Sequence, residues 1–218
     1  MKIIPCERGD TEWLKHHLGI PTCSRFDDLL TPKTLKPSGG RERYRGELMA
    51  EWLLGQPLEW GSNAWTERGT EMEDEARAWY EMAHDVEVVA HQLVLRDDGL
   101  VGGSPDGLIV GTRRGLEIKC LGAGKHVLAM LDGGAKLIEE HRGQVQGYLH
   151  LTEYYAWDLL SYHPDLPPVV ARVEPDPAYQ DALRPVLDDF VAVLEDDKRR
   201  LAQYKMERPW TMNLEAES

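Results

Sequence analysis

The sequence is poor in cysteine and contains no long apolar run. Its three cysteines, Cys6, Cys23 and Cys120, form no C-x-x-C pair, so neither a zinc site nor a disulfide framework is predicted. Without about 18 consecutive apolar residues, no membrane span is expected. The first residues, MKIIPCERGD, lack the apolar core of a signal peptide. These absences favour a protein of a reducing cytoplasm.

Positive charge is also scarce, because the net charge is −13. Such a balance at first disfavours a nucleic-acid-binding protein. The distribution is uneven, however. Residues 1–45 carry nine Lys/Arg against six Asp/Glu, whereas residues 46–152 carry nine against eighteen and residues 153–218 seven against fourteen. The basic residues gather within 32–45, which would give a DNA-binding protein a local basic track.

The most informative stretch is residues 101–120, VGGSPDGLIVGTRRGLEIKC. Glu117 and Lys119 are two residues apart, so on a strand they project from the same face, while the alternate apolar residues point to the other. Asp106 precedes them on the other strand of a predicted hairpin. Two carboxylates and one ammonium suit divalent-metal and phosphate chemistry. The alternative is an ordinary surface ion pair on a hairpin.

Flanking motifs favour the first interpretation. Trp13 is followed by LGIPTCS at 18–24, then by RGTEMEDEARAWYE at 68–81, SPDGL, LEIKC, and HRGQVQGYLHLT at 141–152. In this order, within residues 13–152, the motifs resemble the lambda exonuclease (YqaJ-type viral recombinase) family of PD-(D/E)XK nucleases. The resemblance implies a restriction-endonuclease-like core. It also implies a cofactor of two Mg²⁺ ions, for which Mn²⁺ would substitute.

The resemblance also implies catalytic residues, namely Asp106, Glu117, Lys119, Glu73 and Gln144. The metal ligands would be Asp106, Glu117, Glu73 and the Ile118 carbonyl oxygen. Lys119 would lie beside the scissile phosphate, as a charge stabiliser or in proton transfer. Glu73 stands in a run of carboxylates that would otherwise be a solvated helix face, and Glu71 is its alternative. Gln144 and Tyr148 are i,i+4 neighbours, whereas Gln146 lies on a different face.

A 5′-phosphate pocket is implied at Ser24 and Ser104. The family's arginine before Leu-Gly is His17 here, and a neutral histidine binds phosphate less strongly than arginine. We therefore expect a weaker preference for phosphorylated ends, or one that depends on pH near about 6.5. Arg25 would compensate. The alternative for His17 is a plain surface histidine.

The family also implies a homotrimeric ring around double-stranded DNA. Basic residues of 32–45 would face its channel: Lys33, Lys36, Arg41, Arg43 and Arg45. Arg113 and Arg114, at the predicted hairpin tip, would add to the lining, and the acidic C-terminal part would face outward. The alternative is that 32–45 is a solvated loop.

Periodicity and turn signals predict one α/β domain over residues 1–218, with a mixed central β-sheet flanked by helices. Helices are expected at 11–18, 24–30, 43–54, 63–83, 124–131, 135–151 and 176–205, the last amphipathic. Met72, Ala76, Trp79 and Ala83 form the expected inward stripe of 63–83. Strands are expected at 86–95, 100–104, 106–111, 115–120, 154–162 and 168–173, and a loop at 31–42.

The function that these features favour is metal-dependent 5′→3′ exonuclease activity on linear double-stranded DNA. It would leave 3′ single-stranded tails for phage-type recombination with a single-strand annealing protein. A bacterial cytoplasm, with phage or prophage origin, is the expected location. A PD-(D/E)XK endonuclease or junction resolvase is the alternative, and a non-catalytic DNA-binding relative is the third possibility.

Overall fold

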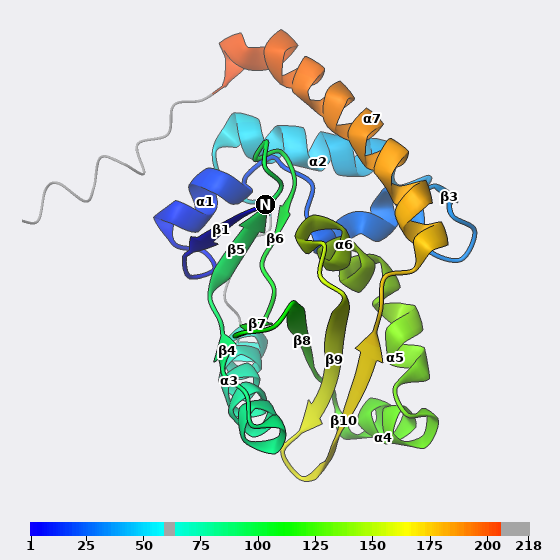
Figure 1. Ribbon diagram of the computed structural model, residues 1–218. Coiled ribbons are helices and arrows are strands. Elements are labelled where there is room, and N and C mark those ends of the chain that lie inside the picture. Colours follow the sequence, from blue (N-terminus) through cyan, green and yellow to red (C-terminus); the bar gives the residue numbers. More distant parts are fainter. Residues whose placement is uncertain (59–63, 206–218) are drawn as a thin grey trace, which may run out of the picture.

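A five-stranded mixed β-sheet forms the centre of the fold (Figure 1). The computed structural model describes residues 1–58 and 64–205. In spatial order the strands are β10 (Leu166–Val173), β9 (Ala156–His163), β8 (Arg114–Cys120), β7 (Gly107–Ile109) and β4 (Val88–Val89). Strands β8 and β9 pair in parallel, and the other neighbours pair antiparallel.

Helices cover both faces of this sheet. Helix α3 (Ala64–His84) packs against β8, whereas α4 (Ala123–Asp132) packs against β9 and β10, on the opposite side together with α5 (Ala135–Glu140) (Figure 1). Because neither face meets bulk water, Leu116, Glu117 and Ile118 are all buried, at 0%, 3% and 3% exposure. The expected α/β architecture with a mixed sheet flanked by helices is therefore confirmed.

The remaining elements pack around one end of the sheet (Figure 1). They include a three-stranded sheet of β1 (Lys2–Pro5), β5 (Gln92–Leu95) and β6 (Gly102–Gly103), and a ribbon of β2 (Leu30–Thr31) and β3 (Lys36–Pro37). The helices there are α1 (Thr11–His17), η1 (Cys23–Asp28), α2 (Arg41–Leu54), α6 (Arg142–Thr152), α7 (Pro177–Leu201) and η2 (Ala202–Tyr204). Helix α6 contacts η1 and β9, so it joins the two regions.

Helix α7 follows the predicted amphipathic pattern over most of its length. Asp176 caps it by accepting hydrogen bonds from two backbone N–H groups of the first turn, and Pro177 occupies the first position, where no N–H partner is needed. The buried stripe is Leu183, Leu187, Phe190 and Leu194. The predicted extension of this stripe is wrong, because Leu201 and Tyr204 are 36% and 65% exposed beyond the contact with α2.

Other sequence predictions fail where one residue redirects the backbone. The strand expected at 86–95 is two strands in different sheets, because His91 takes a left-handed conformation with φ +54° between β4 and β5. The helix expected at 135–151 breaks at His141 into α5 and α6. In α3 the fully buried partner of Ala76 is Tyr80, while the expected Ala83 is exposed.

A buried ionic cluster ties α3 to three strands. Asp158 on β9 is completely buried and accepts a hydrogen bond of 2.5 Å from the Tyr80 hydroxyl. Arg114 on β8 and Arg172 on β10 donate to the same carboxylate, at 3.1 Å and 2.7 Å. Burial raises the pKa of Asp158, but the hydrogen bonds from Arg172 and Tyr80 outweigh it and hold that pKa below its usual value. The carboxylate is thus ionised in the folded protein.

In the part of the chain that the structure describes, none of the helices combines the length and the hydropathy needed to cross a membrane.

Candidate active site

The hairpin of β7 and β8 brings the predicted carboxylates together. Asp106 directly precedes β7, and its Oδ2 accepts a 2.6 Å hydrogen bond from the backbone N–H of Ile118 on β8. The hairpin register, in which Gly107 pairs with Leu116, sets Asp106 against Glu117 and Ile118. The backbone of β8 therefore fixes the position of Asp106.

Helix α6 adds Gln144 to this pair. The Glu117 Oε1 atom accepts hydrogen bonds from Lys119 Nζ at 2.8 Å and from Gln144 Nε2 at 2.7 Å. The Gln144 Oε1 atom accepts from the same Lys119 ammonium at 3.1 Å. Glu117, Lys119 and Gln144 thus form a closed triangle, in which the amide holds both charged groups.

The carboxylates of this cluster repel one another, and this repulsion adds to the effect of burial on the pKa values of Glu117 and Glu73. Burial, followed by the charge of Asp106, raises the pKa of Glu117 to about 8, and Glu73 adds to this effect. Burial also raises the pKa of Asp106, and burial together with the Asp106 charge raises that of Glu73. Burial lowers the pKa of Lys119, but Glu117, Asp106 and Glu73 outweigh it, so this pKa is raised. Three acidic groups therefore share one poorly solvated region with one ammonium.

This arrangement fits a divalent cation that binds oxygen. The Glu117 Oε2 atom is buried and has no hydrogen-bond partner, so it is an orphaned acceptor inside the cluster. A hard cation prefers carboxylate and carbonyl oxygens and would relieve the repulsion among them. Among the side chains that the structure describes, which exclude those of 59–71, no group of three or more His, Cys, Asp or Glu residues is arranged to hold a metal ion.

Ser104 connects the cluster to α1 and α6. Its Oγ accepts a 2.8 Å hydrogen bond from the Trp13 indole N–H, and its carbonyl oxygen accepts one of 2.9 Å from the Tyr148 hydroxyl. Tyr148 is fully buried one turn beyond Gln144, as the i,i+4 spacing predicted for a shared face. Gln146 lies elsewhere, since its side chain bonds the backbone of Glu174 and Asp176.

Residues 12–155 match the profile of a family described as the YqaJ-like viral recombinase domain. The chain belongs to this family. The match spans Trp13, the Asp106 hairpin and Gln144, and the family expected from the sequence is therefore confirmed. No curated protein sequence is significantly similar to the chain.

Solved structures agree with the family. An alkaline exonuclease (LHK-Exo) from Laribacter hongkongensis is 30% identical with a TM-score of 0.75, covering 89% of this chain and 97% of that one. The same exonuclease in complex with dAMP gives a TM-score of 0.74 at 30% identity, covering 89% and 99%. A phage related exonuclease from Haemophilus somnus 129PT is 13% identical with a TM-score of 0.65, covering 86% and 99%, and shares the fold.

The YqaJ-like domain has a cavity of about 550 Å³ beside this cluster, lined by His17, Ser24 and Arg25 as well as Trp13. His17 stacks on Trp13 with ring centroids 3.7 Å apart. Burial, followed by the charge of Arg8, lowers the pKa of His17 to about 3. This lowered pKa disfavours the expected pH effect near 6.5 from His17.

Arg25 lines the cavity, but its charge is already neutralised by two carboxylates. Its Nε donates to Asp28 at 2.6 Å, its Nη2 donates to Glu47 at 2.8 Å, and the guanidinium lies over the Tyr44 ring. Ser24 is exposed, with its Oγ 3.4 Å from the Thr22 hydroxyl. Arg25 is thus poorly placed to replace the charge that His17 lacks.

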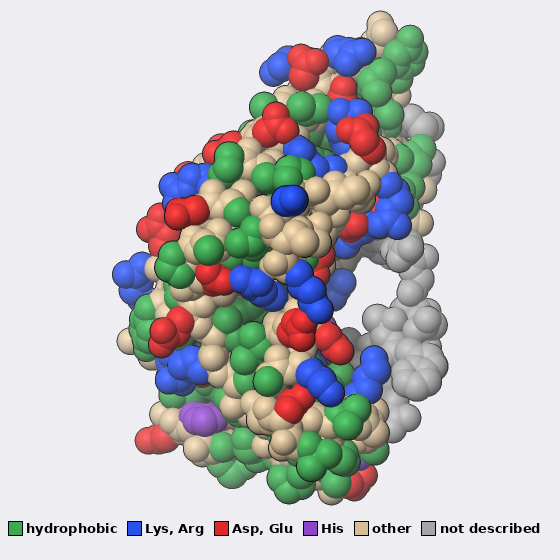
Figure 2. All heavy atoms as spheres, turned by 90° about the vertical axis from the view of Figure 1, so that its right-hand side faces the viewer, with side chains coloured by type: hydrophobic (Ala, Val, Ile, Leu, Met, Phe, Trp, Pro, Cys, Tyr) green, Lys and Arg blue, Asp and Glu red, His purple; other side chains and the backbone are tan. Residues whose placement is uncertain are grey.

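The predicted basic segment 32–45 is largely paired with acidic residues in this YqaJ-like domain. The pairs are Lys33–Glu139 at 2.6 Å, Arg41–Asp189 at 2.7 Å, Arg43–Asp28 at 2.9 Å and Arg45–Asp197 at 3.4 Å. Asp189 and Asp197 belong to α7, so the expected separation of this segment from the acidic C-terminal part is wrong at Arg41 and Arg45. Figure 2 shows Lys/Arg and Asp/Glu side chains interleaved over one face instead of forming one basic patch.

The two hairpin arginines differ from expectation as well. Arg114 is mostly buried and bonds Asp158, so it does not line a channel. Arg113 donates to the Glu153 carbonyl oxygen. Lys36 is exposed on the short strand β3. Of the expected channel residues, Lys36 has no ion pair with another residue in the described ranges.

Two arginines near the cluster are not among the residues predicted from the sequence. Arg77 Nε donates to the Asp106 carbonyl oxygen at 3.2 Å, and its Nη1 bonds Asp74 at 2.7 Å. It stands one helical turn after Glu73, so the i,i+4 spacing was the available signal. The charge of Arg8 offsets part of the rise in the pKa of Glu73 and of Asp106, but no sequence motif marks Arg8. The side chain of Glu71, the alternative to Glu73, lies outside the described residues.

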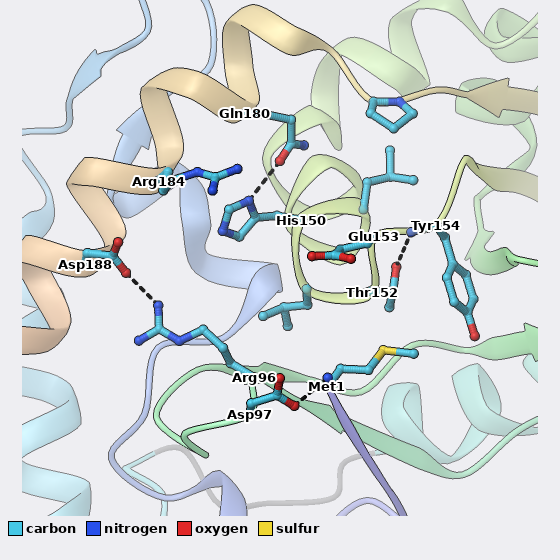
Figure 3. Close-up of a pocket in the computed structure, with 13 residues that line it drawn as sticks. Met1, Arg96, Asp97, His150, Thr152, Glu153, Tyr154, Gln180, Arg184 and Asp188 are labelled. Carbon is cyan, nitrogen blue, oxygen red and sulfur yellow. Dashed lines mark hydrogen bonds and ion pairs between the residues drawn. The ribbon is translucent and has the colours of Figure 1, made fainter.

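A second cavity, of about 530 Å³, lies between the end of α6, α7 and the turn after β5 (Figure 3). In it His150 Nδ1 pairs with Gln180 Oε1 at 2.9 Å, and Arg96 bonds Asp188 at 2.8 Å (Figure 3). None of the predicted catalytic residues lines it. The candidate active site of the YqaJ-like domain is therefore the cluster around Glu117.

Proposed function

We propose that this YqaJ-like domain is a metal-dependent 5′→3′ exonuclease that digests linear double-stranded DNA and leaves 3′ single-stranded tails for recombination. The observation that carries the proposal is the Glu117–Lys119–Gln144 triangle beside Asp106, with one buried carboxylate oxygen unpaired. Its similarity to an alkaline exonuclease supports the same activity.

In this proposal two Mg²⁺ ions, which Mn²⁺ could replace, would be held by four groups: Asp106, Glu117, Glu73 and the Ile118 carbonyl oxygen. A divalent cation supplies charge neutralisation at the phosphate and a more acidic water. Lys119 keeps its proton, because neighbouring carboxylates raise its pKa, and its ammonium stabilises negative charge that develops on the scissile phosphate. Gln144 forms hydrogen bonds with both Lys119 and Glu117, and so keeps these two side chains in position between successive cuts.

The decisive experiment compares linear and covalently closed circular duplexes in the presence and absence of Mg²⁺. We expect digestion of the linear form with Mg²⁺, release of nucleotides from 5′ ends, and no nicking of the circle. EDTA should stop the reaction. Nicked circles would instead support the endonuclease or resolvase, binding without cleavage would support a non-catalytic relative, and release from 3′ ends would contradict the polarity.

We also propose that the active form is a homotrimeric ring around the duplex, working with a single-strand annealing protein in a bacterial cytoplasm. A single chain of net charge −13 would be repelled by DNA, which carries about one charge per 1.7 Å. A closed ring would retain such an acidic enzyme on its substrate, with Lys36 available to contact phosphate. Light scattering should give three times the 24.8 kDa chain mass. A monomer at micromolar concentration that still digests long duplexes processively would contradict the ring.

A further inference from the structure

Glu73 differs from the other two predicted metal-binding carboxylates in having no side-chain partner. The Asp106 carboxylate accepts a hydrogen bond from the backbone N–H of Ile118, and the Glu117 carboxylate accepts one from Lys119. The Glu73 side chain, by contrast, has no hydrogen bond or ion pair with any residue that the structure describes. Its place beside the cluster therefore depends on how the backbone of α3 lies against the hairpin of β7 and β8.

Two kinds of contact hold α3 on the central sheet. Tyr80 is fully buried among apolar residues of β8 and β9, but apolar packing is non-directional and does not by itself fix where a helix lies along a strand. The Tyr80 hydroxyl donates to Asp158, and the Tyr162 hydroxyl donates to Glu75, so these hydrogen bonds connect α3 to β9. Neither hydrogen bond involves the segment of Asp106.

Arg77 supplies the connection between α3 and this segment. Its Nε donates to the Asp106 carbonyl oxygen at 3.2 Å, and its Nη1 donates to Asp74 at 2.7 Å. The side chain is only 14% exposed, and Asp74, on the preceding turn of the same helix, orients it. Because the donors of a guanidinium have a fixed planar arrangement, one side chain can hold both oxygens at once. Arg77 stands one turn after Glu73, so it fastens this part of α3 to the backbone of Asp106.

We propose that Arg77 is a positioning residue that sets the distance between Glu73 and Asp106, and thereby the affinity of the site for a divalent cation. This role rests on the proposed function, in which both carboxylates are metal ligands. The charge and the positioning of Arg77 have opposite effects on cation binding. Its positive charge repels Mg²⁺ and by itself weakens binding. Its hydrogen bonds strengthen binding, because a ligand that is already held in place loses less freedom when it coordinates a metal.

Isothermal titration of Mn²⁺ into the protein without DNA tests this role. Arg77→Gln should weaken Mn²⁺ binding roughly 10- to 100-fold, the usual cost of losing a group that orients a metal ligand. Arg77→Lys keeps the charge but loses the planar fork, so its affinity should fall between those of the wild type and Arg77→Gln. Arg199→Gln, which breaks a comparable i,i+3 pair with Asp196 on α7, is the matched control and should bind Mn²⁺ as the wild type does.

The effect of Arg77 should act through Glu73. In a Glu73→Gln background, Arg77→Gln should lower the Mn²⁺ affinity little further, since the ligand that Arg77 places is already gone. On linear duplex, the Mg²⁺ concentration for half-maximal digestion should rise in Arg77→Gln by the same factor as the Mn²⁺ dissociation constant. The rate at saturating Mg²⁺ should recover to near the wild-type value, because Arg77 does not contact the reacting atoms.

Equal or tighter Mn²⁺ binding by Arg77→Gln would overturn this role, and so would an equally large loss of affinity in the Glu73→Gln background. A digestion rate that stays low at saturating Mg²⁺ would overturn it as well. If Arg77→Gln does not fold, a wild-type affinity in Arg77→Lys has the same consequence. A wild-type protein that binds no Mn²⁺, or a Glu73→Gln protein that binds it as tightly as the wild type, would instead contradict the metal assignment in the proposed function.

Discussion

Asp106→Asn is expected to reduce DNA digestion roughly 1,000-fold, because the loss of several kcal/mol of metal-dependent stabilisation corresponds to about tenfold per 1.4 kcal/mol. Glu117→Gln and Lys119→Ala should have comparable effects, since the three groups act at one place. Steady-state rates on linear duplex with saturating Mg²⁺ measure the loss. Retention of more than a few per cent of the wild-type rate by Asp106→Asn would contradict the assignment of this cluster.

The fold should survive these changes. An asparagine at position 106 can still accept the hydrogen bond from the Ile118 backbone N–H. It also removes one of the carboxylates whose repulsion raises the pKa of Glu117. Thermal unfolding without metal should therefore show a melting temperature no lower than that of the wild type. Glu87→Gln, which neutralises an exposed carboxylate away from the cluster, is the matched control and should leave both activity and melting temperature unchanged.

The hairpin of β7 and β8 could be predicted from the sequence because its signals are local. The two-residue spacing of Glu117 and Lys119 on one strand predicts a shared face, and their side chains are 2.8 Å apart. Gln144 was reached through the family resemblance, since its approach to Glu117 depends on how α6 packs. The split at His91 was missed because a left-handed residue other than glycine has no strong sequence signal.

The cavity was predicted less accurately because charge partners are set by tertiary contacts. Arg41 and Arg45 looked like free cations in the sequence, but α7 brings Asp189 and Asp197 to them from about 150 residues away in the chain. His17 resembles a solvated, titratable histidine in the sequence, but it stacks on Trp13 and is partly buried, which lowers its pKa. In both cases the residue type is known from the sequence, but the side chains that surround it are determined by the tertiary fold.

Asp158→Asn is expected to destabilise the folded protein by about 3–5 kcal/mol at pH 7, the usual cost of removing one partner from a buried ion pair. The change leaves Arg114 mostly buried without its counter-charge and weakens the hydrogen bonds from Arg172 and Tyr80. In a domain of this size the melting temperature should fall by roughly 6–20 °C. Chemical denaturation by urea, monitored by circular dichroism, measures the free energy of unfolding.

The pH dependence tests the ionic origin of this effect. Because the pKa of Asp158 is depressed in the folded state, its contribution is fully present above the unfolded value of about 3.9 and is lost as the pH falls through the lower folded value. The difference between wild type and Asp158→Asn should therefore be largest near neutrality and shrink below about pH 4.

Two further variants provide reference values for the change in the free energy of unfolding. Asp189→Asn breaks an exposed pair with Arg41 and should cost at most about 1 kcal/mol. Tyr80→Phe removes one hydrogen bond to the same buried carboxylate and should fall between the two, at about 1.5–3 kcal/mol. If Asp158→Asn were no more destabilising than Asp189→Asn, the ionic cluster around Asp158 would not stabilise the packing of α3 against β8, β9 and β10.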